Sequence, residues 1–139
     1  VAGGPHVRAA VSGAGAIALE NQATLTVFSV GGAETTKERA RSFVEAGEKI
    51  VGEVLGDAVD VETQVEMADS VEDAIVDAAK AHDVIVFGAT RKGALRGRLV
   101  GSVPRTIVKR TDKTVILARG RSPTLGILGR VRALLGGKR

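Results

Sequence analysis

Val84-Ile-Val-Phe87 is an apolar run that leads directly into the loop Gly88-Ala-Thr-Arg-Lys-Gly93, and Gly101-Ser102 ends the same loop just before a helical stretch. This order predicts a strand, a basic glycine-bearing loop and the start of a helix. Glycine lets backbone N–H groups approach an anion without a Cβ in the way, and the free N–H groups at a helix N-terminus carry roughly half a positive charge. We therefore predict that this loop is the functional centre and that it holds phosphate.

The chain before this loop predicts helices and strands in alternation. Apolar residues at helical spacing from Val7 to Ala18 predict a helix, and the β-branched run Leu25 to Val30 predicts a strand. Gly31-Gly32 break the chain, and an amphipathic pattern from Phe43 to Leu55 then predicts a long helix that ends near Gly56.

The next segment predicts an edge strand and a third helix. From Val59 to Glu66 apolar and polar residues alternate, which is typical of a strand with one exposed face at the edge of a sheet. Asp69 or Ser70 can cap the helix that follows, which carries apolar residues from Val71 to Ala79.

The whole pattern predicts one α/β domain with a parallel five-stranded sheet and helices on both faces. The apolar runs Val84 to Phe87 and Thr114 to Leu117 predict strands covered on both faces, and Ser102 can cap the helix between them with Pro104 in its first turn. Val1-Ala2 would be the stub of the first strand. Right-handed crossovers then place the ligand site beyond the carboxyl ends of the strands, where the loops at residues 3–6 and 88–102 face one another.

Charge divides the chain at the same loop. Residues 1–87 carry 6 basic and 15 acidic side chains, whereas residues 88–139 carry 14 and 1, which leaves a net charge of +4. The basic part can attract phosphates, nucleic acid or an anionic membrane, or it can be a solvated surface that neutralises its acidic neighbour. An aromatic content of 2% argues against specific nucleic-acid binding and leaves weak, salt-sensitive association open.

Few side chains offer catalytic chemistry. The chain has no cysteine and only two histidines, so a thiolate metal site is excluded and no zinc pair or nucleophilic triad is evident. His6 is either a ligand neighbour or a surface residue, and His82 is expected at a helix end. Asp73 and Asp77, one helical turn apart, are expected to be solvated. Because the loop also lacks the Gly-Lys-Ser or Gly-Lys-Thr of a P-loop, we predict no enzyme and no catalytic or metal-binding residues.

The segment 119–139 differs from the rest. It contains six basic residues and no acidic one, and Leu128, Val131, Leu134 and Leu135 recur at helical spacing. This pattern predicts a basic amphipathic helix that contacts anionic lipid or a partner, although the four glycines at 126, 129, 136 and 137 leave disorder in solution as the alternative. The first residue, Val1, follows neither an initiator Met nor a signal-like segment, so we expect a piece of a longer polypeptide.

The stretch Val86 to Val103, with Lys113-Thr-Val-Ile-Leu-Ala118 after it, resembles the universal stress protein domain over residues 1–118. Family members that bind ATP carry Gly, two residues, Gly, nine residues, then Gly-Ser or Gly-Thr. The chain matches at Gly88, Gly101 and Ser102 and has Arg91 at the second glycine. The loop and Gly-Gly-Pro-His6 look most like domains attached to the cytoplasmic end of amino-acid permeases and related transporters.

The resemblance implies a Rossmann-like fold of the adenine-nucleotide-alpha-hydrolase type and a site for an adenine nucleotide: ATP, AMP or cyclic di-AMP, with magnesium left open. Val30 and Phe87 match residues of the adenine pocket. Arg91 and Lys92 either replace backbone donors to phosphate or fill the pocket from above. The predicted nucleotide-binding residues are Ala2, Gly3, Gly4, Val30, Phe87, Gly88, Ala89, Thr90, Arg91, Lys92, Gly93, Gly101, Ser102 and Val103.

The function predicted in this way is that of a non-enzymatic, cytoplasmic regulatory domain, attached to an inner-membrane transporter in the same polypeptide. The resemblance also implies a homodimer through the last strand, Thr114 to Leu117. The alternative is a nucleotide-free assembly module that dimerises through the same strand. The loop and the charge pattern do not distinguish the two.

Overall fold

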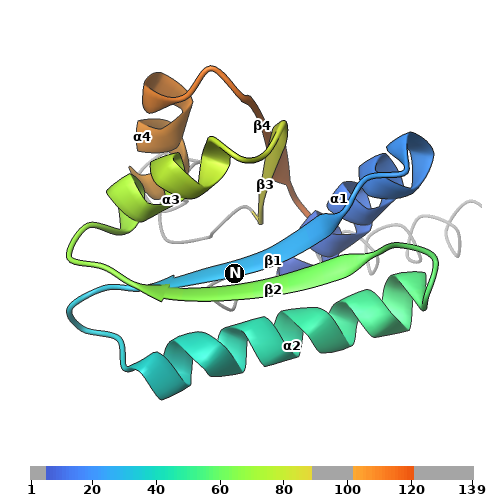
Figure 1. Ribbon diagram of the computed structural model, residues 1–139, viewed down its shortest axis with the longest axis horizontal. Helices are drawn as coiled ribbons and strands as arrows, with labels where there is room; N and C mark the ends of the chain where they lie inside the picture. Colours follow the sequence, from blue (N-terminus) through green and yellow to red (C-terminus); the bar gives the residue numbers. More distant parts are fainter. Residues whose placement is uncertain (1–5, 89–101, 121–139) are drawn as a thin grey trace, which may run out of the picture.

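The computed structural model describes residues 6–88 and 102–120, and Figure 1 shows their arrangement. Helices and strands alternate along these residues, as the sequence predicts. In chain order they are α1 (Val7–Asn21), β1 (Leu25–Gly31), α2 (Lys37–Leu55), β2 (Val61–Met67), α3 (Val71–Ala79), β3 (Val84–Gly88), α4 (Ser102–Arg110) and β4 (Thr114–Ala118).

The four described strands form two parallel pairs. In one pair Leu25 of β1 lies opposite Val61 of β2, and in the other Val84 of β3 lies opposite Thr114 of β4. The predicted five-stranded sheet is therefore wrong for the described residues, because no backbone hydrogen bonds join β1 to β3 there. The predicted stub Val1-Ala2 lies outside the described residues.

Helix α1 connects the two strand pairs. It packs against α2, β3 and β4 and also contacts β1. A Cβ at Gly15 would overlap the methyl groups of Leu55, so with Leu55 in this position the close approach of α1 to α2 favours glycine here. The packing of one helix on both pairs explains how two short sheets form one body (Figure 1).

The main apolar core lies between α1, α2 and the β1–β2 pair. Its buried members are Val11 of α1, Val27 of β1, and Val44 and Val51 of α2. Half-buried apolar side chains from the same elements and from β2 surround them. The helical and alternating spacings in the sequence point these side chains inward, so this core is predictable from local pattern alone.

The β3–β4 pair is less covered than its apolar sequence predicts. All five residues of β3 are only half-buried, and Leu117 of β4 is 40% exposed. Helix α1 packs on this pair, whereas α3 makes its main contacts with α4 and β1. The described residues therefore leave the β3–β4 pair half-buried, whereas the sequence predicts strands covered on both faces.

Polar caps set the ends of the helices. The Thr36 hydroxyl accepts the N–H of Arg39 and begins α2, and the Ser70 hydroxyl accepts the N–H of Asp73 and begins α3, each at 3.2 Å. Gly56, with φ of 55°, ends α2 as predicted. Helix α4 begins at Ser102 itself, so Ser102 is its first residue rather than the residue before it, while Pro104 lies in the first turn as predicted.

Candidate functional site

The predicted site residues that the structure describes lie at strand ends and at one helix start. Val30 is the penultimate residue of β1, and Phe87 and Gly88 end β3. Ser102 and Val103 begin α4, with Ser102 exposed and Val103 half-buried. The other predicted residues lie outside the described part of the chain: Ala2, Gly3, Gly4, Ala89, Thr90, Arg91, Lys92, Gly93 and Gly101. So does the predicted basic helix within residues 121–139.

The end of β3 touches the start of α1. A Cβ added at Gly88 would lie 3.0 Å from both the carbonyl carbon and the carbonyl oxygen of His6, closer than side chains normally approach backbone. The two loops that the topology brings together therefore do meet at this point. Glycine at position 88 is required by this contact with α1, a reason additional to the phosphate approach that the sequence predicts.

His6 also joins the start of α1 to the end of β4. Its Nδ1 accepts a hydrogen bond from the backbone N–H of Gly120 at 3.1 Å. A neutral imidazole that accepts at Nδ1 carries its proton on Nε2, so the ring presents an N–H donor on its other side. His6 is thus half-buried between two strand ends, rather than a loose surface residue.

His82 has a structural role that its position in the sequence does not reveal. Its Nδ1 lies 2.8 Å from the carbonyl oxygen of Ala78, and its Nε2 lies 2.9 Å from the hydroxyl of Thr26. Because a carbonyl oxygen can only accept, Nδ1 donates and Nε2 accepts from the hydroxyl. The ring therefore ties the end of α3 to β1.

A hollow of about 390 Å³ lies beyond the carboxyl ends of β1 and β2. It is formed by the turn after β1 and the turn after β2, next to the starts of α2 and α3. Its lining residues are Gly31, Gly32, Ala33, Thr35, Met67, Ala68 and Asp69. The sequence predicts Val30 beside a ligand but does not identify this hollow, because its two turns lie more than 30 residues apart.

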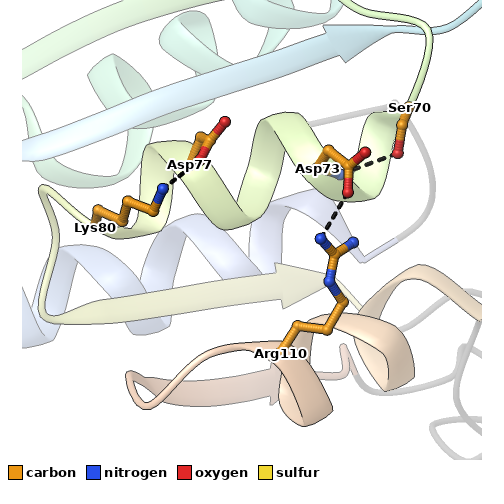
Figure 2. A network of polar contacts seen from close by, with 5 residues as sticks. All are labelled: Ser70, Asp73, Asp77, Lys80 and Arg110. Atoms are coloured by element: carbon orange, nitrogen blue, oxygen red, sulfur yellow. Dashed lines mark hydrogen bonds and ion pairs between the residues drawn. The ribbon is translucent and has the colours of Figure 1, made fainter.

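Helices α3 and α4 are joined by the polar network in Figure 2. Arg110 Nη2 lies 2.6 Å from Asp73 Oδ1, and the backbone N–H of Asp73 donates to the Ser70 hydroxyl. Lys80 and Asp77 form a second, exposed ion pair at 2.5 Å. Asp73 and Asp77 are 60% and 70% exposed, so both are solvated as predicted.

The network changes the acidity of one carboxyl group. The hydrogen bond from Arg110 holds the pKa of Asp73 below its usual value, and the bond involving Ser70 acts in the same direction. The bond from Arg8 likewise lowers the pKa of Glu53 and ties α1 to α2. Neither carboxyl lines the hollow.

The described residues contain neither a metal-binding cluster nor a membrane-spanning helix. Residues 6–88 and 102–120 hold no group of three or more His, Asp or Glu side chains arranged to bind a metal ion. In the same residues no helix has the length and apolar content needed to cross a membrane.

Parallel strands joined by helices, with the candidate residues at the strand ends, define a Rossmann-like α/β domain. The model of the universal stress protein family matches residues 1–119. The chain therefore belongs to the universal stress protein family. It is 30% identical over 88 residues to a universal stress protein of Mycolicibacterium smegmatis, a match that covers 63% of this chain and 30% of the length of that relative.

Solved structures of the family share the fold. The universal stress protein of Archaeoglobus fulgidus superposes with a TM-score of 0.70 at 23% identity, over 85% of this chain and 92% of that one. The same protein in complex with dAMP gives a TM-score of 0.66 at 21% identity, over 85% and 91%. A universal stress protein in complex with cAMP gives 0.65 at 22% identity, over 86% and 91%.

Proposed function

We propose that this domain binds an adenine nucleotide at the carboxyl ends of β1 and β3 and acts as a regulatory module rather than as an enzyme. The observation that carries the proposal is the contact of Gly88 with His6, which brings the end of β3 and the start of α1 together. A parallel α/β domain binds ligands at such a place. The complexes of family members with dAMP and cAMP support an adenine-containing ligand.

The proposed roles follow the positions of the residues. Phosphate would lie near Gly88, Gly101, Ser102 and Val103, at the first turn of α4, where backbone N–H groups are free and the helix dipole favours an anion. The adenine would lie toward Val30 and Phe87. The side chains of Arg91 and Lys92 add positive charge to the same loop, which suits a phosphate-bearing ligand.

In a regulatory module the nucleotide acts through differential affinity. Occupancy of the site would bias whatever is attached to the domain between two states. A transporter in the same polypeptide is the attachment that we propose, on the basis of the Gly-Gly-Pro-His6 and Gly-Ala-Thr-Arg motifs. The domain would then lie on the cytoplasmic side, and a basic segment at residues 119–139 would suit an anionic membrane surface.

The second candidate function is assembly. The edge of β4 away from β3 has no strand partner among the described residues, and Leu117 on this strand is 40% exposed. An open strand edge pairs readily with another copy. We propose a homodimer through Thr114 to Leu117, which can coexist with nucleotide binding or replace it.

A thermal-shift titration with ATP, AMP, cAMP and cyclic di-AMP, with and without magnesium, tests the first proposal. A ligand bound only by the native state raises the melting temperature as its concentration rises. A saturating shift supports a sensor and identifies its ligand. No shift with any nucleotide, from a folded protein that is dimeric by light scattering, supports the assembly module instead. Leu117→Glu should then produce monomers.

A further inference from the structure

The hollow beyond β1 and β2 offers hydrogen-bond acceptors and one negative charge. Asp69 is the one charged residue among those that line it, and Thr35 adds a hydroxyl. Asp69 is exposed, and it has no ion pair with any described residue. A ligand group that enters here meets a free carboxylate, which accepts hydrogen bonds and repels anions.

Each helix start beside the hollow already has a side-chain cap for one backbone N–H and an acidic residue in its first turn. Thr36 caps α2 and Glu38 lies in its first turn, while Ser70 caps α3 and Glu72 lies in its first turn. These groups occupy backbone donors and offset the positive ends of the helix dipoles. The hollow is therefore unsuited to phosphate, although two helices begin there.

Positive charge lies instead on α4. Arg105, Lys109 and Arg110 belong to this helix, whose first turn follows the basic loop. The first turn of α3 separates the two regions: Val71 lies against Gly32 of the hollow, at 3.3 Å from an added Cβ, and Asp73 binds Arg110 of α4. This arrangement of charge would favour a nucleotide with its phosphate toward α4 and its base toward the hollow.

We propose that the hollow holds the base and that Asp69 selects a base with an exocyclic amino group over one with an oxo group in the same place. This inference rests on the proposed nucleotide-binding function and names the residue that decides between bases. The 6-amino group of adenine donates to a carboxylate. The 6-oxo group of hypoxanthine is an acceptor, and it would face the carboxylate with no proton between them.

The experiment compares AMP with IMP by isothermal titration calorimetry on the wild-type protein and on Asp69→Asn. The two nucleotides carry the same phosphate, so their affinity ratio isolates the base. An amide can donate to the 6-oxo group and accept from the 6-amino group. We expect the wild type to bind AMP about tenfold more tightly than IMP, and Asp69→Asn to bind the two with affinities that differ by no more than about twofold. A hydrogen bond to an exposed charged group changes the affinity by about tenfold.

Asp60→Asn is the matched control. It makes the same change of charge at the amino end of β2, away from the hollow, and should keep the preference for AMP. A second ligand tests the inference on the wild-type protein alone. N6,N6-dimethyl-AMP keeps the adenine ring but has no hydrogen on its exocyclic nitrogen, so the wild type should bind it about tenfold more weakly than AMP.

The outcomes separate this inference from the proposed function. Equal binding of AMP, IMP and the dimethyl analogue by the wild type overturns the role of Asp69 while nucleotide binding stands. A preference for AMP that survives in Asp69→Asn overturns it as well. Failure of every nucleotide to bind overturns the proposed function and this inference together.

Discussion

The backbone carbonyl of His6 lies 3.0 Å from the position that a Cβ on Gly88 would occupy. These residues are 82 positions apart, and they join the start of α1 to the end of β3. Their contact brings the residue that precedes α1 against the last residue of β3. We propose that a nucleotide binds next to this contact between His6 and Gly88.

Replacement of Gly88 by alanine should destabilise the domain by about 1–3 kcal/mol, because the new methyl group meets backbone atoms that cannot move aside as a flexible side chain would. Urea unfolding measures the change. Gly13→Ala is the control, since nothing lies within 4 Å of its added Cβ and it sits inside α1. It should stabilise the protein by about 0.5–1 kcal/mol. Equal stability of wild type and Gly88→Ala would show that the contact is loose.

The His6→Ala variant should lose about 1 kcal/mol of stability, because the N–H of Gly120 loses its acceptor. His6→Asn, whose side-chain oxygen can take the place of Nδ1, should recover part of the loss. Amide hydrogen exchange gives the specific readout. The Gly120 amide should exchange faster in His6→Ala than in His6→Asn, and unchanged exchange in both would rule out the bond as a constraint on the segment after β4.

Thr26→Val should cost about 1 kcal/mol in the free energy of unfolding, because the hydroxyl that donates to His82 Nε2 is replaced by a methyl group of similar size. Thr63→Val on the neighbouring strand β2 is matched in residue type, is exposed and has no hydrogen bond to a histidine within the described residues. It should have little effect in the same urea titration. Similar losses in both variants would point to strand propensity rather than to the histidine.

Arg110→Gln should weaken the α3–α4 contact in a pH-dependent way. Arg110 lowers the pKa of Asp73 in the folded state, so the pair stabilises the fold above the ordinary aspartate pKa of 3.8, and this contribution is lost as the pH falls through the lower folded value. The difference in stability between wild type and variant should therefore be present at pH 7 and smaller at pH 3. The effect should be small, because both side chains are exposed.

Urea midpoints at the two pH values provide the measurement. Arg105→Gln serves as the control, since it removes the same charge from an exposed position of α4 that has no ion pair among the described residues. An equal difference in urea midpoint for Arg105→Gln would assign the effect to helix charge in general and not to Asp73. A difference for Arg110→Gln that is as large at pH 3 as at pH 7 would do the same.

The elements of the fold were largely predictable because their signals are local. The alternation of helix and strand, the end of α2 at Gly56 and the capping role of Ser70 all follow from patterns within a few residues. The sequence predicts complete burial of β3, but the structure leaves its residues half-buried. An apolar run reports that a strand prefers to be covered, and only the packing of other elements decides whether it is.

The candidate site was predictable only in part. Gly88 and Ser102 follow from the strand, loop and helix order around them, and the described structure places both at the ends of their elements. The sequence did not predict the position of Asp69 beside the hollow or the contact of His82 with Thr26. Each depends on residues 30 or more positions away, and no local pattern encodes such a contact.

The sequence by itself determined the class of fold, the order of its elements, the family and the basic loop at which phosphate is expected. Those properties reside in periodicity, turn chemistry and charge, which act between near neighbours. The tertiary structure alone decided that the described strands form two pairs, that His6 meets Gly88 and Gly120, and that an acidic hollow lies beyond β1 and β2. These depend on how α1 packs on both pairs, which is a balance of contacts between distant parts of the chain.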